Sequence, residues 1–292
     1  MATHTTAEKP PAKYKPVIGL RLQKSLTAIL AYSILILASL VVILPLTWVF
    51  LTSLKEKSLV YQIPPAWVFT PTSENYLALF NKYPFPQYFL NSAIVASITT
   101  LLGLTIGGMA AYSMTRFNTG GNFFKGWVLN NRTMPPIVVL IPIFMLASQF
   151  KLINKHISLI LAYLSFLLPF CIWMLISFFE AIHPDMEEAA LVDGASRLQS
   201  LFLIVIPLAA PGIAATGILS FLFSWNEFMF ALILTGNATR TLPIGVANFL
   251  TQRGVEMGEL TAATMVMVIP VMLLAFSIRR YLVQGLSFGG VK

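Results

Sequence analysis

Glu227 is the residue of this sequence best placed to bind a ligand, because it is an acid inside a long apolar segment. A charge at the centre of a membrane helix costs roughly 3 kcal/mol, so an acid at such a position indicates a functional role. Glu227 follows Trp225 and Asn226. An indole ring packs on the CH groups of a sugar, while an amide and a carboxylate bind its hydroxyls. Neighbouring helical residues point about 100° apart, so only part of this set can face one cavity.

Arg132 is a second candidate for the same pathway. It belongs to the polar run NNRT, which precedes two prolines in another apolar segment. Helix breaks inside a membrane are tolerated where they border a cavity. For Glu227 the alternatives are a polar contact between helices or an ion pair with Arg132. For Arg132 the alternative is a side chain that reaches the cytoplasmic membrane surface.

A short acidic stretch, PDMEEAALVDGAS, interrupts the apolar sequence further along. Pro184 suits the first turn of a helix, and the three acids that follow it would lie at the positive end of the helix dipole. Ala190 and Gly194 are four residues apart and share a face on which another surface can approach the backbone. Gly194 also suits the left-handed conformation that ends a helix. The stretch therefore predicts either a simple connecting helix or a docking site for a soluble partner.

The motifs of a phosphate loop, a zinc helix and a dithiol centre are absent from the sequence. It has no GxxxxGK[ST] loop, no HExxH and no CxxC. Its three histidines are far apart, and Cys171 is the only cysteine. We therefore expect no catalytic residues and no metal site, and any chemical energy that drives the protein must come from another chain.

The composition indicates a membrane protein with several spans. The chain of 292 residues is 57% hydrophobic and 10% charged, with a mean hydropathy of +0.79, whereas a soluble domain has roughly 25% charged residues. A bilayer core needs roughly 20 apolar residues per helix. Six segments qualify: Leu26–Leu51, Asn91–Thr115, Trp127–Phe150, Ile157–Phe179, Leu208–Leu234 and Leu260–Val283. The predicted fold is all-α and polytopic, and the net charge of +8 is spread over the loops, which argues against nucleic-acid binding.

The distribution of Lys and Arg favours both termini in the cytoplasm. The acidic stretch then also lies in the cytoplasm. We expect a disordered tail at residues 1–25, a transmembrane domain at 26–283 with a cytoplasmic loop at 181–207, and a cytoplasmic tail at 284–292. The external segment Thr52–Tyr88 is rich in proline and aromatic residues and is expected to form short helices and turns.

One motif in the acidic stretch resembles a known family. The sequence EAA at 188–190 is followed after three residues by Gly194, and after nine more by IVIP, which begins at Ile204. This order is similar to the EAA loop of ABC importer membrane subunits, with Ile206 where that pattern has leucine. Other stretches resemble the carbohydrate-uptake branch, in particular the maltose-type second permease: TSLKEKSLVYQIPPAW, SENYLALF, YFLNSAIVAS, AAYSMTRFNTGG, FSWNEFMFAL and GLSFGGVK. The resemblance covers nearly the whole chain after the tail.

The resemblance implies a type I ABC importer permease fold with six transmembrane helices and a cytoplasmic EAA coupling helix. It implies a prokaryotic plasma membrane and four kinds of partner: membrane lipid, a second six-helix permease, two ATPase subunits, and an external sugar-binding protein or lipoprotein. ATP and Mg would bind to the ATPase subunits, so this chain would be a transport subunit without a cofactor of its own. The implied ATPase-coupling residues are Glu188, Ala189, Ala190, Asp193, Gly194 and Pro207. A C-terminal ATPase contact is implied at Gly289 and Gly290.

The expected cargo is a di- or oligosaccharide, but the EAA loop reports the coupling and not the cargo. A polyamine or another small solute is the alternative, although a polyamine cavity should hold several acids and this chain offers one well inside a span. A self-contained transporter driven by protons or sodium is a further alternative. Such proteins usually carry several ionisable groups within the membrane, which this sequence does not.

Overall fold

A computed structural model describes residues 18–133, 135–251 and 254–288 of the chain. The chain divides into two compact units, residues 1–49 and residues 50–292. The helices and strands follow in the order α1 (Ile18–Ser53), α2 (Lys57–Val60), α3 (Glu74–Lys82), α4 (Phe85–Arg116), α5 (Gly121–Thr133), α6 (Pro136–Gln149), α7 (His156–Glu180), α8 (Asp185–Val192), α9 (Arg197–Ser200), a π-helical turn (Leu201–Val205), α10 (Ile206–Trp225), α11 (Met229–Leu234), α12 (Leu242–Ala247), β1 (Leu250–Thr251), β2 (Gly254–Val255) and α13 (Met257–Phe288).

The predicted all-α membrane architecture is confirmed. Five helical stretches are long and apolar enough to cross a membrane: Ser25–Ser53, Phe85–Arg116, His156–Glu180, Arg197–Trp225 and Met257–Ser277. Helix α6 is also apolar but has only 14 residues. Within the described residues, the only sheet is the short antiparallel pair of β1 and β2. The protein is therefore a multi-pass membrane protein.

Helix α1 makes up most of the described part of the first unit. Its apolar side chains from Leu26 to Leu46 are exposed to the surroundings of the chain. A helix that is apolar on all sides meets lipid or other membrane helices. It begins at Ile18, within the predicted tail; residues 1–17 lie outside the described part of the chain.

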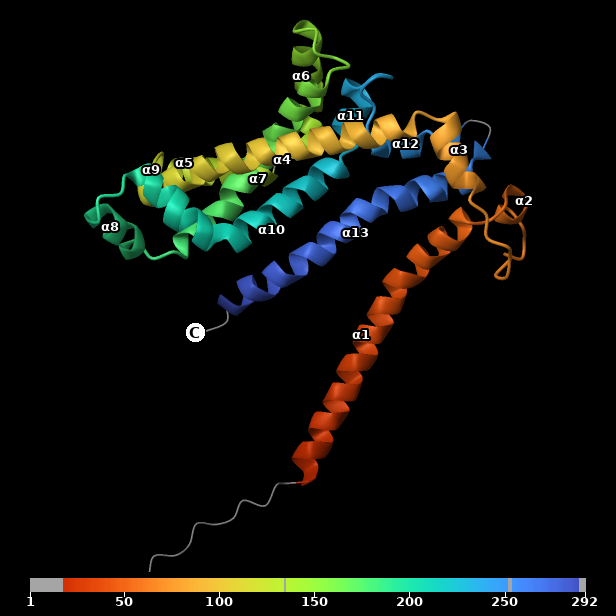
Figure 1. The fold of residues 1–292 in the computed structure, drawn as a ribbon, viewed down its shortest axis with the longest axis horizontal. Coiled ribbons are helices and arrows are strands. Elements are labelled where there is room, and N and C mark those ends of the chain that lie inside the picture. The colour runs from red at the N-terminus through yellow and green to blue at the C-terminus, as the bar shows by residue number, and fades with distance from the viewer. Residues whose placement is uncertain (1–17, 134, 252–253, 289–292) are drawn as a thin grey trace, which may run out of the picture. The chain divides into compact units, whose positions relative to one another are not determined.

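The second unit is a bundle in which α4, α7, α10 and α13 run along one another (Figure 1). Helices α8 and α9 lie at one end of this bundle, and α3 and α12 lie at the other. Small residues allow the closest approach within it. A Cβ atom added at Gly107 on α4 would lie 2.9 Å from the Cβ of Cys171 on α7, so the two helices pack nearly backbone to backbone, as is common in membranes.

The third predicted span, Trp127–Phe150, is not one helix. Helix α5 ends at Thr133 and α6 begins at Pro136. Pro135 is extended, with ψ of 130°. Proline lacks an N–H and disfavours helical backbone at the residue before it, so two prolines in succession divide the segment.

The fifth predicted span, Leu208–Leu234, has different bounds in the structure. A continuous helical stretch runs from Arg197 to Trp225 and then stops. The short run after Arg197 joins α10 through the π-helical turn Leu201–Val205, which directly precedes the turn that contains Pro207. A local π-helical adjustment of this kind accommodates the N–H that a proline lacks within a continuous helix. Helix α11 follows as a separate element.

The segment between α1 and α4, predicted to be external, forms α2, α3 and turns, as predicted. Helix α3 packs against the start of α13. The side-chain amide of buried Asn75 on α3 donates to the carbonyls of Ser53 and Lys55 at 2.9 and 2.8 Å. These bonds hold α3 against the C-terminal end of α1. Helix α13 continues to Phe288, five residues beyond the predicted end of the sixth span at Val283.

Candidate functional site

The acidic stretch forms helix α8, and its start and end follow the sequence rules. Pro184 precedes the helix, and three acids occupy its first turn. Gly194 has a left-handed backbone with φ of +91°. The Gly194 N–H donates to the carbonyl of Leu191 and the Ala195 N–H donates to that of Ala190, which is the Schellman arrangement. A Cβ at Gly194 would meet nothing within 4 Å. Glycine is therefore required here by the backbone conformation and not by a close contact within the chain.

Helix α9 begins with a capping box that our sequence analysis missed. The Gln199 N–H donates to the Ser196 hydroxyl, and the Ser196 N–H donates to the side-chain oxygen of Gln199, at 3.3 and 2.7 Å. The S-x-x-Q spacing, which is readable in the sequence, is the signal for this motif. Two well-defined helix ends therefore hold the turn between α8 and α9.

The residues assigned to ATPase coupling lie on an outward face of this loop. Glu188, Ala189, Asp193 and Gly194 are exposed, and Ala190 is half-buried. Pro207, in the first turn of α10, is exposed as well. Three apolar side chains of the loop are also exposed: Met186, Val192 and Leu198. Val192 is 87% exposed. Exposed apolar side chains near exposed acids are typical of a protein-binding surface.

Glu187 differs from its acidic neighbours because it is 2% exposed. Its carboxylate accepts a hydrogen bond from the Tyr112 hydroxyl at 2.7 Å and pairs with the guanidinium of Arg116. Arg116 also donates to the carbonyl of Ile182 at 3.0 Å. Removing one partner of a buried ion pair costs about 3–5 kcal/mol. Sequence reasoning did not single out Glu187 as different, because three acids follow Pro184 and nothing in the local sequence says which is buried.

Glu227 lies in the break between α10 and α11. Its two carboxylate oxygens accept hydrogen bonds from the N–H groups of Phe230 and Ala231 at 2.9 and 3.2 Å. The side chain thus satisfies free donors at the start of α11, where a negative charge is favourable. These two hydrogen bonds explain how a carboxylate is held within this apolar part of the chain.

Glu227 also lines a cavity of about 340 Å³ whose walls include four phenylalanine rings. The other lining residues are Pro136, Phe166, Leu167, Phe170, Phe223, Met229 and Phe230. The rings of Phe166 and Phe230 are stacked, with centroids 6.1 Å apart. The cavity therefore combines aromatic faces with one carboxylate, and the break before α6 contributes Pro136 to its wall.

Trp225 and Asn226 do not line this cavity. The Trp225 indole is 1% exposed and donates to the carbonyl of Met267 on α13 at 3.1 Å. Asn226 donates to the carbonyl of Leu222, one turn back on α10. The structure thus gives both residues helix-packing and helix-ending contacts, and a role for them in substrate binding stays a prediction. Arg132 belongs to the last turn of α5, but its side chain lies outside the described residues, as do Gly289 and Gly290.

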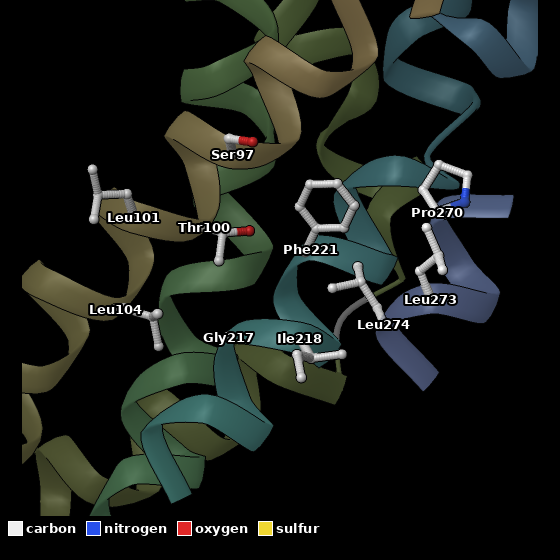
Figure 2. Close-up of a pocket in the computed structure, with 10 residues that line it drawn as sticks. All are labelled: Ser97, Thr100, Leu101, Leu104, Gly217, Ile218, Phe221, Pro270, Leu273 and Leu274. Atoms are coloured by element: carbon white, nitrogen blue, oxygen red, sulfur yellow. The ribbon is translucent and has the colours of Figure 1, made fainter. Parts of the chain in front are cut away.

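A larger hollow of about 550 Å³ lies between α4, α10 and α13. Figure 2 shows its lining side chains, which come from these three helices: Ser97, Thr100, Leu101, Leu104, Gly217, Ile218, Phe221, Pro270, Leu273 and Leu274. Two hydroxyls are its only polar side chains. Such a surface suits hydrocarbon better than a sugar, because it offers few partners for hydroxyl groups.

The loop between α11 and α12, predicted to be external, is fastened to the bundle by polar side chains. Asn91 on α4 donates to the carbonyls of Ala238 and Arg240 at 3.1 and 2.9 Å. The other end of its amide contacts the ring of His156 at 2.8 Å. The hydroxyl of Ser92 accepts a hydrogen bond from the N–H of Leu242. The loop therefore follows the outer end of α4.

An ion pair and a hydrogen bond fasten the start of α13 to the segment between α1 and α4. Lys57 pairs with Glu259 at 2.6 Å, and the Tyr83 hydroxyl donates to Glu256 at 2.8 Å. Burial and this hydrogen bond raise the pKa of Tyr83 to about 12. The hydroxyl is therefore protonated and donates at physiological pH. No group of three His, Cys, Asp or Glu side chains that could hold a metal occurs in the described part of the chain.

Comparisons with known proteins agree on one family. Residues 103–288 match the family described as binding-protein-dependent transport system inner membrane component. The chain is 33% identical to the trehalose/maltose transport system permease protein MalG of Thermococcus litoralis, over 88% of this chain and 94% of that protein. It is 36% identical to the sulfoquinovosyl glycerol transport system permease protein SmoH of Agrobacterium fabrum, over 85% and 88%.

A solved structure has the same fold. It is a chain of a bacterial ABC transporter involved in the import of the acidic polysaccharide alginate, and it matches with a TM-score of 0.71 and 20% identity. The match covers 92% of this chain and 99% of that chain. At this identity, the likeness concerns the fold alone.

Proposed function

Since this chain belongs to the family of binding-protein-dependent transport system inner membrane components, we propose that it is the permease subunit of an ATP-driven importer for a di- or oligosaccharide. The observation that carries this proposal is the similarity, over nearly whole chains, to permeases that are named for sugars or sugar-containing solutes. These are the trehalose/maltose and sulfoquinovosyl glycerol permeases and the diacetylchitobiose uptake permease NgcG of Streptomyces coelicolor, which is 34% identical over 90% of this chain.

Its partners would be a second six-helix permease, two ATPase subunits and an external binding protein. The sequence contains no phosphate-binding loop, so ATP and Mg would bind to the ATPase subunits. The protein would span a prokaryotic plasma membrane with both termini in the cytoplasm. Helices that are apolar and exposed, such as α1, support a partner within the membrane, because their side chains meet few others of the same chain.

The α8–α9 loop would be the contact with the ATPase subunits. Its exposed face carries Glu188, Ala189 and Gly194 beside the apolar Val192. A small, acid-bearing helix at the membrane surface fits a cleft in a soluble partner. When the ATPase subunits close on ATP, the loop would be displaced, and the helices would rock so that the sugar cavity faces first outside and then inside.

The aromatic cavity beside Glu227 would be this chain's contribution to the sugar pathway. Aromatic faces pack against the CH groups of a sugar ring, and a carboxylate accepts hydrogen bonds from its hydroxyls. Both carboxylate oxygens already accept one backbone N–H each. A carboxylate has about four acceptor positions, so two remain for a ligand.

The experiment is to purify the tagged chain from its native membrane in mild detergent and to identify its companions by mass spectrometry. A second permease and an ATPase are expected, and ATP hydrolysis by the complex should rise when a sugar-loaded binding protein is added. Recovery of the chain alone in several detergents and with trapped nucleotide would refute the proposal. Uptake that survives ATP depletion but collapses with an ionophore would favour an ion-driven transporter. If ATP hydrolysis rises only with a polyamine-loaded binding protein, and not with a sugar-loaded one, the proposal that the cargo is a sugar is refuted.

A further inference from the structure

The cytoplasmic loop is joined to α4 by more than the chain connections of its two ends. Covalently, α8 follows α7 and precedes α9. Helix α4 is distant in sequence, since Glu187 and Arg116 are 71 residues apart. Yet the only buried acid of α8 is held by two side chains of the last two turns of α4.

Three groups of α4 and the loop satisfy one another in this contact. One oxygen of Glu187 accepts from the Tyr112 hydroxyl, and the other pairs with Arg116. The Arg116 side chain is 10% exposed, and it also bonds the carbonyl of Ile182 just before α8. A charged hydrogen bond with two fixed partners is short and directional, so it resists sliding as well as separation.

A second contact fastens the same loop to the same helix end. The guanidinium of Arg197, at the start of α9, lies 5.7 Å from the centre of the Phe117 ring, directly after α4. The ring of Tyr112 packs edge-on against both Phe117 and Phe179. The loop is thus held at both of its helices.

We propose that Glu187 is a positioning residue that locks the coupling loop to α4 through Tyr112 and Arg116, so that displacement of the loop moves α4 directly. This inference rests on the coupling function proposed for the loop. The exposed acids of the same helix would contact the partner, whereas Glu187 would pass the movement on within this chain.

Helix α4 is suited to carry this movement across the membrane. It has 32 residues and is therefore about 48 Å long. Near its other end, Asn91 and Ser92 hold the external loop at Ala238, Arg240 and Leu242. A movement that enters α4 at Arg116 would therefore reach the external face through one helix.

The test uses the whole importer reconstituted in proteoliposomes, and its readout is the number of sugar molecules imported per ATP hydrolysed. Glu187→Gln keeps the shape of the side chain but removes its charge, and we expect this ratio to fall by about tenfold or more. Tyr112→Phe removes one hydroxyl and should lower the ratio by about threefold to tenfold. In the double variant Glu187→Gln/Arg116→Gln the ratio should be no lower than in Glu187→Gln, because both changes break one lock.

Lys125→Gln is the matched control. It breaks the ion pair with Glu180 at the same end of the bundle, a pair of 3.3 Å whose side chains are 33% and 52% exposed. Exposed pairs contribute little, so the ratio of sugar to ATP should not change.

A merely structural role for Glu187 would reduce the amount of complex recovered and leave the ratio of the remaining complex unchanged, which would overturn the inference. If Glu187→Gln does not assemble, Tyr112→Phe decides in the same way. A parallel loss of ATP hydrolysis and import, at constant ratio, would mean that Glu187 serves ATPase docking; the lock would be wrong and the proposed function would stand. The proposed function itself fails if no ATPase is recovered with the unaltered chain.

Discussion

Three substitutions of Gly194 can show whether a glycine is needed for the backbone conformation of the turn or for contact with a partner. Its φ of +91° is left-handed, and a Cβ there would meet nothing within the chain. A left-handed residue other than glycine costs about 1–2 kcal/mol, and less for Asn or Asp. At 1.4 kcal/mol per factor of ten, Gly194→Ala lowers the population of this turn by about 5–30-fold. Gly194→Asn should lower it less, although its side chain is larger.

Comparison of Asn with Asp at this position isolates charge. The two side chains have nearly the same shape and tolerate the same backbone, but Gly194→Asp adds a negative charge next to exposed Asp193. If the loop enters a partner cleft shaped for an uncharged turn, Asp should block coupling while Asn does not. We therefore expect sugar import to be highest in the Asn variant, lower in the Ala variant and lowest in the Asp variant.

The assay is sugar import and ATP hydrolysis by the reconstituted complex, with the amount of assembled complex measured for each variant. Equal import by the Asn and Asp variants would refute the docking role of this position, because the added charge would then have no consequence. Import by the Ala variant above that of the Asn variant would refute the conformational argument, since steric size would then matter more than the left-handed turn.

Three further substitutions test single contacts. Glu227→Gln leaves one oxygen where two accepted backbone N–H groups; we expect slower uptake and a changed sugar profile, and an unchanged rate and profile in transport assays would remove Glu227 from the pathway. Trp225→Phe keeps an aromatic side chain but loses the hydrogen bond from the indole to the Met267 carbonyl. The loss of about 1 kcal/mol should lower the temperature at which the purified complex unfolds by about 2–4 °C. The affinity for sugar should not change, and a weaker affinity would mean that the indole contacts the sugar. Ser196→Ala removes one half of the capping box and should destabilise α9 by about 1 kcal/mol, which hydrogen exchange of the α9 amides would report as faster exchange; unchanged rates would show that the box contributes nothing.

The features that sequence predicted well are those with local causes. The start of α8 after Pro184 and its end at Gly194 depend on residues within one helical turn, and the structure has both. The break before α6 also has a local cause, two adjacent prolines, although the segment Trp127–Phe150 was predicted as one span. Chain-local rules such as these are enough to place the α8–α9 loop between two membrane helices.

The features that sequence missed depend on distant neighbours. Glu187 and Glu188 are adjacent and chemically identical, yet one is buried and one exposed. The difference comes from Arg116 and Tyr112, which only the packing of α4 brings to the loop. The indole of Trp225 is another case, since an aromatic residue beside an acid suggests a ligand site, whereas its nitrogen bonds a carbonyl on α13.

The packing along α4 decides whether a lock at one of its ends can matter at the other. A helix that packs through long flexible side chains absorbs a displacement by changes of rotamer. Gly103 and Gly107 instead face Cys171 so closely that an added Cβ at either would lie 3.1 Å or less from it, and backbones in such contact have little room to slide. Helices α4 and α7 would then move as one body, and α7 leads directly into the loop. The buried carboxylate of Glu187 joins the loop to α4, and α4 already shares a rigid interface with α7, which favours rocking of the bundle over bending of a single helix.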